Sequence, residues 1–184
     1  KYNVKATFFV TNTHPDYQNM IAEEAKRGHT VAIHSASHKY DQIYTSEQAF
    51  FDDLEQMNSI IKAQTGNDAS IIRFPGGSSN TVSKDYCPGI MTQLVNDVTA
   101  RGLLYCDWNV SSGDANSKPI STEQVVQNVI SGVQSHNVSV VLQHDIKDFS
   151  VNAVEQIIQW GQANGYTFLP LTTSSPMSHH RINN

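Results

Sequence analysis

The stretch Thr30-Val31-Ala32-Ile33-His34-Ser35-Ala36-Ser37-His38 decides how this chain folds. Its first four residues are rich in β-branched side chains, which is typical of a strand buried on both faces. Two histidines four positions apart follow, and such residues share a face when the backbone makes a helical turn. Because neutral imidazoles are common zinc ligands, the stretch predicts a strand that ends in a candidate metal site. The spacing alone is a weak signal, so other motifs must support it.

The same alternation of strand and helix extends along the chain. Short apolar runs predict six strands, and amphipathic stretches between them predict five helices. We expect strands at residues 6–10, 30–33, 70–73, 103–106, 138–142 and 166–169. We expect helices at residues 17–27, 45–66 and 90–100, and two more that start at residues 121 and 150 and carry apolar residues up to 133 and 161, respectively.

Capping signals mark the starts of three of these helices. Thr45 with Gln48, and Ser121 with Gln124, have the spacing of a capping box, and Ser150 is placed to open the last helix. Residues 172–184 are expected to form an irregular tail.

The order of these elements predicts an α/β fold with a mainly parallel sheet, either open or closed into a barrel. Four residues whose side chains can take part in catalysis follow successive predicted strands, namely His34, Arg73, Asp107 and His144. Catalytic residues of a βα barrel occupy this rim, so the placement favours the barrel.

Composition narrows the class of protein. A chain of 184 residues is long enough for one domain with its own core, and we expect a single domain over residues 1–184. The formal net charge of −5 gives no electrostatic footprint for nucleic acid or an anionic membrane. A neutral or weakly charged substrate is therefore expected. No apolar run is long enough to span a bilayer.

The two cysteines and the remaining histidines indicate little about the function of the protein. Cys87 and Cys106 cannot form a disulfide scaffold; two unpaired thiols are favoured over one disulfide, although the pairing stays open. Of the histidines outside any motif, we expect four to be solvated: His29, His136, His179 and His180.

Four clusters in this order resemble the polysaccharide deacetylase family, carbohydrate esterase family four with its NodB-like domain. They are His34-Ser35-Ala36-Ser37-His38, Arg73-Phe74-Pro75, Asp107-Trp108 and Leu142-Gln143-His144. The resemblance covers essentially the whole chain and implies a distorted, incomplete (βα) barrel. It also implies a metal-dependent hydrolase that removes N-acetyl groups from a polysaccharide.

The resemblance assigns roles to individual residues. His34 and His38 match the two metal histidines, which in the family bind zinc or another divalent metal such as cobalt. Arg73 matches the arginine that orients the catalytic base, and His144 the acid that protonates the leaving amine. Asp107 matches the aspartate that tunes this acid.

Three further residues are implied to contact the substrate. Trp108 would line the groove, and Leu142 would shape a pocket for the acetyl methyl group. Gly76 stands where family members frequently carry a tyrosine whose backbone N–H binds the oxyanion. The backbone donor is retained here, but the aromatic wall is not, which leaves the substrate preference open.

One family motif has no counterpart in the chain. Thr-Phe-Asp-Asp, which carries the general base and a third metal ligand, is expected roughly 20 to 30 residues upstream of residue 6, the length of one βα unit. Asp16 and Asp41 match no motif position. We therefore expect an N-terminally truncated domain without its first strand, with weakened metal binding and impaired activity.

Among possible substrates the resemblance favours N-acetylglucosamine of peptidoglycan over chitin or acetyl-xylan. Such polymers imply an extracellular or cell-surface protein, although no signal or anchor is present in this sequence. The oligomeric state stays open. A non-catalytic carbohydrate-binding relative is the main alternative. A zinc protease is disfavoured because the histidine motif lacks the glutamate of H-E-x-x-H, and a serine hydrolase because residues 76–80 form no G-x-S-x-G elbow.

Overall fold

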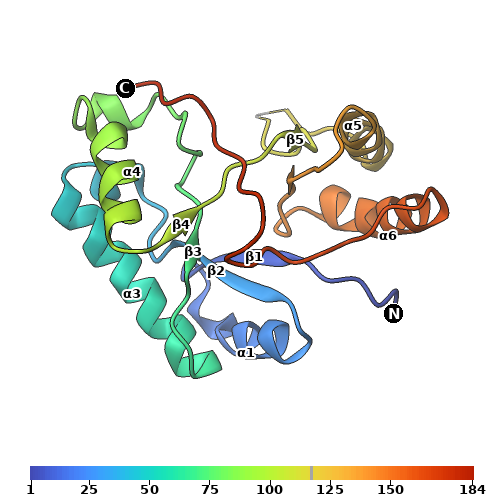
Figure 1. Cartoon of the computed structure of the whole chain (residues 1–184), viewed down its shortest axis with the longest axis horizontal. Helices are drawn as coiled ribbons and strands as arrows, with labels where there is room; N and C mark the ends of the chain where they lie inside the picture. The colour runs from blue at the N-terminus through green and yellow to red at the C-terminus, as the bar shows by residue number, and fades with distance from the viewer. Residues whose placement is uncertain (117) are drawn as a thin grey trace. The chain divides into compact units, whose positions relative to one another are not determined.

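The computed structural model describes residues 1–116 and 118–184, which form two compact units (Figure 1). The large unit comprises Lys5–Asp107 and Pro170–Asn184. The small unit comprises Lys1–Val4 and Trp108–Leu169. That residues 1–184 form one domain stays a prediction.

A four-stranded parallel sheet organises the large unit. Its strands follow the order β1 (Thr7–Thr11), β2 (Thr30–Ser35), β3 (Ile71–Ile72) and β4 (Leu104–Tyr105). Every neighbouring pair is parallel, which confirms the predicted class of sheet. In parallel pairing all carboxyl ends lie at one edge, so the residues that follow β2, β3 and β4 are brought to the same edge.

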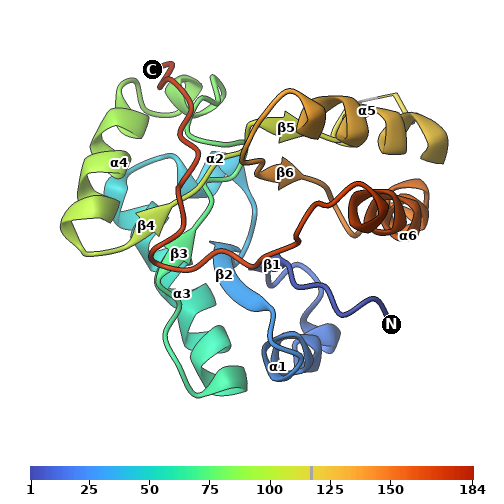
Figure 2. The ribbon, with the colours of Figure 1, turned by 45° about the vertical axis from the view of Figure 1, so that its right-hand side comes forward.

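Helices pack along this sheet, with α3 placed between α1 and α4 (Figure 2). The helical elements of the large unit are η1 (Pro15–Tyr17), α1 (Asn19–Lys26), α2 (Tyr40–Ile43), α3 (Glu47–Thr65), η2 (Ser83–Asp85) and α4 (Ile90–Ala100). The sequence predicted α1, α3 and α4, but it contains no signal for the single turn α2.

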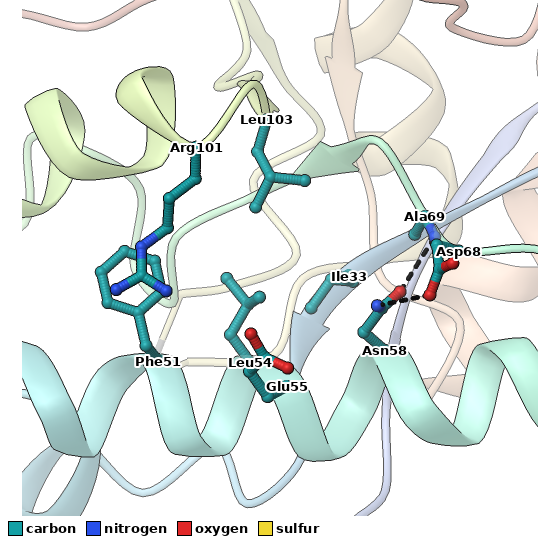
Figure 3. Close-up of a pocket in the computed structure, with 9 residues that line it drawn as sticks. All are labelled: Ile33, Phe51, Leu54, Glu55, Asn58, Asp68, Ala69, Arg101 and Leu103. Carbon is teal, nitrogen blue, oxygen red and sulfur yellow. Dashed lines mark hydrogen bonds between the residues drawn. The ribbon is translucent and has the colours of Figure 1, made fainter.

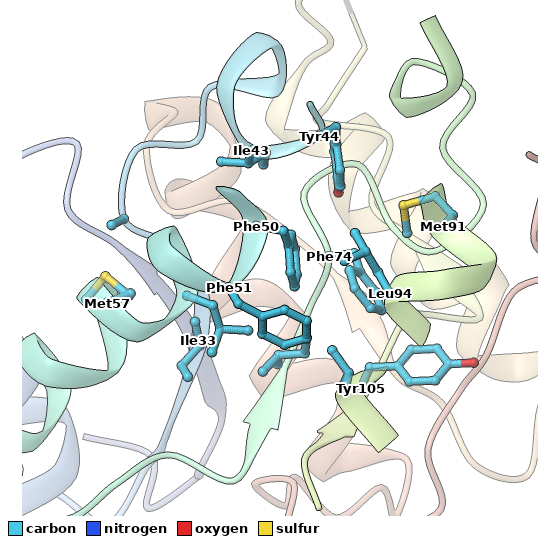
Figure 4. Packing of buried hydrophobic residues seen from close by; sticks show 14 of the residues in the cluster. Ile33, Ile43, Tyr44, Phe50, Phe51, Met57, Phe74, Met91, Leu94 and Tyr105 are labelled. Atoms are coloured by element: carbon cyan, nitrogen blue, oxygen red, sulfur yellow. The ribbon is translucent and has the colours of Figure 1, made fainter. Parts of the chain in front are cut away.

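An aromatic cluster fills the core between α3 and the sheet (Figure 4). Phe74 has no exposed surface, and its ring centroid lies 5.4 Å from that of Phe50 and 5.5 Å from that of Tyr105. Burying a side chain of this size contributes about 1.5–3 kcal/mol. Because Phe74 follows Arg73 directly, the same packing fixes the backbone of a predicted site residue.

The small unit has its own core and a two-stranded parallel sheet. Strand β5 (Val110–Ser111) pairs with β6 (Val141–Leu142), and the two helices are α5 (Thr122–Gln134) and α6 (Asp148–Ala163). Valines of α5 pack with Ala153 and Ile157 of α6 to form the core. The predicted strand at residues 138–142 is thus shortened to its last two residues, since Val138 is exposed.

Two of the three predicted helix starts differ from the structure. The Ser121 hydroxyl caps α5 by accepting the Gln124 N–H, as predicted. However, Ser46 rather than Thr45 caps α3, because the Thr45 hydroxyl donates to a carbonyl in the preceding turn. Helix α6 begins at Asp148, and the Ser150 hydroxyl donates to a carboxylate in another segment instead.

The predicted strand at residues 166–169 is wrong. This segment is irregular, and the Tyr166 N–H donates to the carbonyl of Gly161 at the end of α6. Tyr166 and Leu169 are exposed, so two of the three apolar side chains that suggested a strand have no core to face. Composition alone cannot distinguish such a segment from a strand.

Residues 170–184 are irregular as predicted, but side chains anchor them to the large unit. The Leu171 N–H donates to the Thr7 hydroxyl, and the Thr30 hydroxyl donates to the Leu171 carbonyl. Farther along, the His179 ring stacks on Tyr105 with centroids 4.0 Å apart. In Figure 2 this segment runs across the sheet from β1 towards β4.

All four histidines expected to be solvated make defined contacts, although His136, whose Nδ1 lies 2.9 Å from the Gly132 carbonyl oxygen, is exposed. Besides His179, the His29 ring packs edge-on against Phe8 and its Nδ1 accepts the Ala6 N–H. His180 donates its backbone N–H to Asp107. Both cysteines are free, as favoured from the sequence. Across the described residues, no helix combines the length and apolarity needed to cross a membrane.

Tight packing of α5 on β5 generates a first prediction. A Cβ at Gly132 would lie 2.4 Å from Cγ1 of Val110, although alanine normally stabilises a helix interior by about 1 kcal/mol relative to glycine. We therefore expect Gly132→Ala to lower the free energy of unfolding by about 1–3 kcal/mol, the cost of overpacking. Ser131→Ala, at the exposed neighbouring position, is the control. Urea titration measures both, and a stabilised Gly132→Ala variant would contradict the packing.

Candidate active site

The two histidines of the opening motif converge. His34 Nε2 and His38 Nε2 lie 3.2 Å apart. His34 Nδ1 lies 2.7 Å from the backbone oxygen of Arg73, at the end of the neighbouring strand. Since a carbonyl can only accept, Nδ1 carries the proton, and the lone pair of His34 Nε2 is directed towards His38.

This arrangement fits a divalent cation. Two nitrogens about 2.05 Å from a tetrahedral zinc ion are about 3.3 Å apart, close to the observed separation. A metal-binding histidine usually donates its second N–H to a carbonyl or carboxylate, as His34 does. Within residues 1–116 and 118–184, no group of three His, Cys, Asp or Glu side chains is arranged for a metal.

The backbone of the histidine loop, residues 34–38, is strained. His38 has a φ of +54°, in the left-handed region that costs a non-glycine residue about 1–2 kcal/mol. Its N–H donates to Oγ of Ser35 over 2.8 Å, which stabilises the turn. Such strain persists only where the surrounding structure imposes it, and it is often found at functional sites. Contacts from neighbouring segments must therefore hold this loop in place.

A residue that the sequence analysis did not select contacts the same loop. Asp53 of α3 accepts hydrogen bonds from Ser35 Oγ and from the N–H groups of Ala36 and Ser37. The sequence contains a signal for it. Asp53 falls three residues after Phe50 and four before Met57, so a carboxylate interrupts the apolar stripe of α3.

Arg73 and Asp107 are buried together at the ends of β3 and β4. The guanidinium of Arg73 donates from Nε to the Cys106 carbonyl and from Nη2 to the Asp107 carbonyl, and it lies over the Phe9 ring. Burial lowers the pKa of Arg73, while the negative charge of Asp107 acts in the opposite direction. These contacts fix the guanidinium rigidly at the sheet edge.

The carboxylate of Asp107 organises the loop that follows Arg73. It accepts the N–H and the hydroxyl of Ser78 and the N–H of His180, and it has no exposed surface. Its oxygens are therefore engaged in holding residues 76–80 and the C-terminal segment. Within the large unit, Asp107 therefore acts as a positioning residue.

Gly76 lies in this loop beside an aromatic ring from another element. Its φ is +77°, and a Cβ there would lie 3.0 Å from the hydroxyl oxygen of Tyr40. The Tyr40 ring also packs edge-on against His38, with centroids 5.6 Å apart. The aromatic group expected at residue 76 is absent, but Tyr40 of α2 places a ring at that position.

The other predicted residues belong to the small unit. His144 Nδ1 lies 2.8 Å from Oδ1 of Asp114, and the His144 N–H donates to Oδ2 of the same carboxylate. The prediction that Asp107 is the carboxylate beside His144 is therefore corrected to Asp114. Only the two-residue strand β5 precedes Asp114, so little in the sequence indicates this partner.

Hydrogen bonding keeps Asp114 ionised. Burial alone would raise its pKa, but donors from His144, Ser150 and Ser112 outweigh burial and hold the pKa well below its ordinary value. The Ser150 hydroxyl lies 2.6 Å from Oδ2, and Lys147 Nζ donates to the Asp114 backbone carbonyl. The result is a histidine whose Nδ1 is bound to a fixed anion.

Trp108 and Leu142 also lie in the small unit. Trp108 is half-buried two residues before β5, and Leu142 is the partner of Ser111 in the β5–β6 pair. Their roles as groove and acetyl-pocket residues stay predictions.

Two cavities are found in the large unit. One of about 450 Å³ borders the histidine loop and is lined by polar side chains that include Ser37, Lys39 and Gln56. The other, of about 280 Å³, lies between α3 and α4 (Figure 3). In it the Arg101 guanidinium stacks over Phe51, and none of the predicted site residues lines it.

Comparison with known proteins identifies the family. The family model described as polysaccharide deacetylase matches residues 1–87. The chain is 98% identical to the crystal structure of the catalytic domain of a peptidoglycan N-acetylglucosamine deacetylase from Eubacterium rectale, covering 100% of this chain and 83% of that one with a TM-score of 0.99. The chain belongs to the polysaccharide deacetylase family. The predicted resemblance is thereby confirmed.

More distant members of the polysaccharide deacetylase family agree. A Bacillus cereus peptidoglycan-N-acetylglucosamine deacetylase is 28% identical over 91% of this chain and 60% of its own length. A bifunctional xylanase/deacetylase of Pseudobutyrivibrio xylanivorans is 28% identical over 94% of this chain and 26% of its own length. The chain thus spans about 60% or less of these two curated relatives. A crystal structure of a B. cereus polysaccharide deacetylase is 25% identical over 99% of this chain and 84% of that one, with a TM-score of 0.77, which supports the predicted fold class.

The ionised state of Asp114 generates a prediction about pH. A carboxyl group whose folded pKa is lowered stabilises the fold above its unfolded pKa of about 3.9, and this stabilisation is lost as the pH falls below that value. We expect Asp114→Asn to lower the free energy of unfolding by about 2 kcal/mol at neutral pH, with a smaller loss at about pH 3.

Urea titrations of wild type and variant at both pH values measure this difference. Asp145→Asn, at an exposed position next to His144, is the control and should change stability little at either pH. A loss for Asp114→Asn that is equal at both pH values would contradict the role of the charge.

The contact between Gly76 and Tyr40 generates another prediction. Gly66 has a similar φ of +80°, but a Cβ added there would have no atom within 4 Å, so Gly66→Ala incurs only backbone strain of about 1–2 kcal/mol. Gly76→Ala should cost more, because its methyl group also meets Tyr40. The Tyr40→Phe background lacks the hydroxyl oxygen nearest to the added methyl group, so there the additional loss of stability at residue 76 should be smaller. Thermal and urea unfolding measure these differences, and equal losses at the two glycines would show that Tyr40 does not crowd residue 76.

Proposed function

We propose that this chain is the catalytic part of a metal-dependent amidohydrolase that removes N-acetyl groups from N-acetylglucosamine of peptidoglycan. The observation that carries the proposal is the convergence of His34 Nε2 and His38 Nε2 to 3.2 Å, with His34 oriented by a carbonyl. The substrate is inferred from the relative that is 98% identical, whose name states peptidoglycan N-acetylglucosamine deacetylase.

His34 and His38 would hold the cation, for which zinc is the first candidate and cobalt another. A bound divalent cation supplies Lewis-acid activation of the acetamide carbonyl and of the attacking water. The protein's contribution is to keep the two Nε2 atoms close together at one point. His34 achieves this through its Nδ1–H donor bond, which excludes the tautomer protonated at Nε2.

Gly76 is proposed to stabilise the oxyanion. Its backbone is exposed, and its N–H makes no hydrogen bond to the described part of the chain. A fixed backbone donor stabilises negative charge that develops on the carbonyl oxygen during attack. Ser78, two residues later, holds this loop on the buried Asp107 and so limits its movement.

His144 is proposed to protonate the departing amine. Asp114 binds Nδ1, so the proton available to the substrate is carried on Nε2. The His144 side chain is 37% exposed, which leaves its outer nitrogen accessible.

The site of action is proposed from the substrate. Peptidoglycan lies outside the cytoplasmic membrane, so the protein is proposed to act extracellularly or at the cell surface. Chitin and acetyl-xylan stay as alternative polymers, and the relative named as a xylanase/deacetylase makes the latter a necessary control.

Acetate release tests the proposal. The chain and an N-terminally extended form are supplied with zinc and offered peptidoglycan fragments, N-acetylglucosamine oligomers and acetyl-xylan. We expect the extended form to release acetate from the first two in preference to xylan. His144→Gln should lower kcat by about 10²–10⁴-fold, the usual contribution of a general acid.

His136→Gln is the matched control, because His136 lies exposed just after α5 and should leave kcat unchanged. Oligomer binding without acetate release by the extended form would instead identify a non-catalytic carbohydrate-binding protein. Preferential release from acetyl-xylan would overturn the substrate assignment.

A further inference from the structure

We infer that Asp53 is a positioning residue that sets the affinity of the His34–His38 pair for a divalent cation, by holding the backbone of the histidine loop. The inference rests on the proposed function, because it assigns a role to Asp53 through that metal pair. It adds a residue on α3 that belongs to none of the motifs.

Three hydrogen bonds connect Asp53 to the loop. Oδ2 accepts from Ser35 Oγ at 2.6 Å and from the Ala36 N–H at 2.8 Å, and Oδ1 accepts from the Ser37 N–H at 2.8 Å. Both carboxylate oxygens are therefore directed at the segment between the two histidines. Hydrogen bonds to an ionised acceptor are shorter and about twice as strong as those between neutral groups.

The Ser35 hydroxyl extends this hold to the second histidine. It donates to Asp53 and accepts the His38 N–H, so one directional chain runs from His38 through Ser35 to the carboxylate. His38 is the loop residue with left-handed φ, and this chain opposes its relaxation. Relaxation would rotate the His38 ring away from its position beside His34.

Asp53 occupies a position on α3 where a charged side chain is not expected. The side chain lies on the stripe of α3 whose other members, Phe50, Leu54 and Met57, are buried. A carboxylate on such a stripe is costly unless its hydrogen bonds are made. Among the described residues no ion pair involves Asp53, and its side-chain hydrogen bonds are all with residues 35–37.

A matched control exists one residue away. Asp52 is exposed on the same helix and accepts a hydrogen bond from Gln48, one turn earlier. Asp52→Asn and Asp53→Asn make the same chemical change in the same helix. Only the latter replaces an acceptor oxygen of the loop by an NH₂ group, which would face an N–H or O–H donor.

Metal titration is the first measurement. Zinc and cobalt are titrated separately against a competing chelator, for the wild type and both variants of the complete chain. We expect Asp53→Asn to raise Kd roughly 10- to 100-fold, the usual effect of removing a group that orients metal ligands. Asp52→Asn should stay within about twofold, and circular dichroism establishes that both variants are folded.

Hydrogen exchange without added metal is the second measurement. The amides of residues 36–38 should exchange faster in Asp53→Asn than in the wild type or Asp52→Asn, while α4 remains equally protected. In a double-mutant cycle on metal affinity, Ser35→Ala and Asp53→Asn should be less than additive, because both interrupt the same chain to His38.

The outcomes separate the two proposals. If the wild type binds zinc and Asp53→Asn binds it equally well, the role of Asp53 is refuted while the proposed function stands. If the wild type binds neither metal, both fall. Weaker binding by Asp53→Asn with additive effects and unchanged exchange would indicate a general loss of stability and would also reject the positioning role.

Discussion

The hydrogen bond from His34 Nδ1 to the carbonyl of Arg73 is the interaction on which the rest of this site depends. It joins the carboxyl ends of neighbouring strands β2 and β3, which the parallel register has already brought side by side. This hydrogen bond fixes both the tautomer and the ring plane of His34, so that its Nε2 faces Nε2 of His38. The buried aromatic cluster around Phe74 keeps the Arg73 backbone in place, so the core directly determines the geometry of the site.

The surrounding loops show how strain is distributed. His38 and Gly76 both have left-handed backbones, and each is held by contacts from a different element. Ser35 and Asp53 hold the first, whereas Ser78 and Asp107 hold the loop that contains the second. Tyr40 packs against the His38 ring, and its hydroxyl fills the space that a Cβ at residue 76 would occupy. The aromatic ring beside residue 76 thus comes from α2, and residue 76 itself can be a glycine.

Much of the fold could be predicted because parallel strands buried on both faces give continuous apolar runs. The α/β class, the sheet of the large unit and helices α1, α3, α4 and α5 follow from periodicity. The strand at residues 166–169 failed since an apolar run does not reveal whether a neighbouring strand exists. The cap at Thr45 failed because its hydroxyl binds a carbonyl in the preceding turn, and the cap at Ser150 failed because its hydroxyl binds the distant carboxylate of Asp114.

The site was predicted less completely for a related reason. His34, His38 and His144 stand in recognisable motifs, but the carboxylates that orient them come from distant segments. Asp114 follows a strand of only two residues, and Asp107, although buried at a strand end, binds Ser78 and His180. Asp53 could have been found as a charge within an apolar stripe, but its partner loop is visible only in three dimensions.

Anomalous X-ray scattering at the zinc edge, from crystals of this chain grown with zinc, tests the central claim most directly. The account predicts one strong peak about 2.1 Å from both His34 Nε2 and His38 Nε2, with His34 Nδ1 still bonded to the Arg73 carbonyl. A peak elsewhere with the two rings turned apart, or no peak at the pair in zinc-saturated crystals, would contradict it.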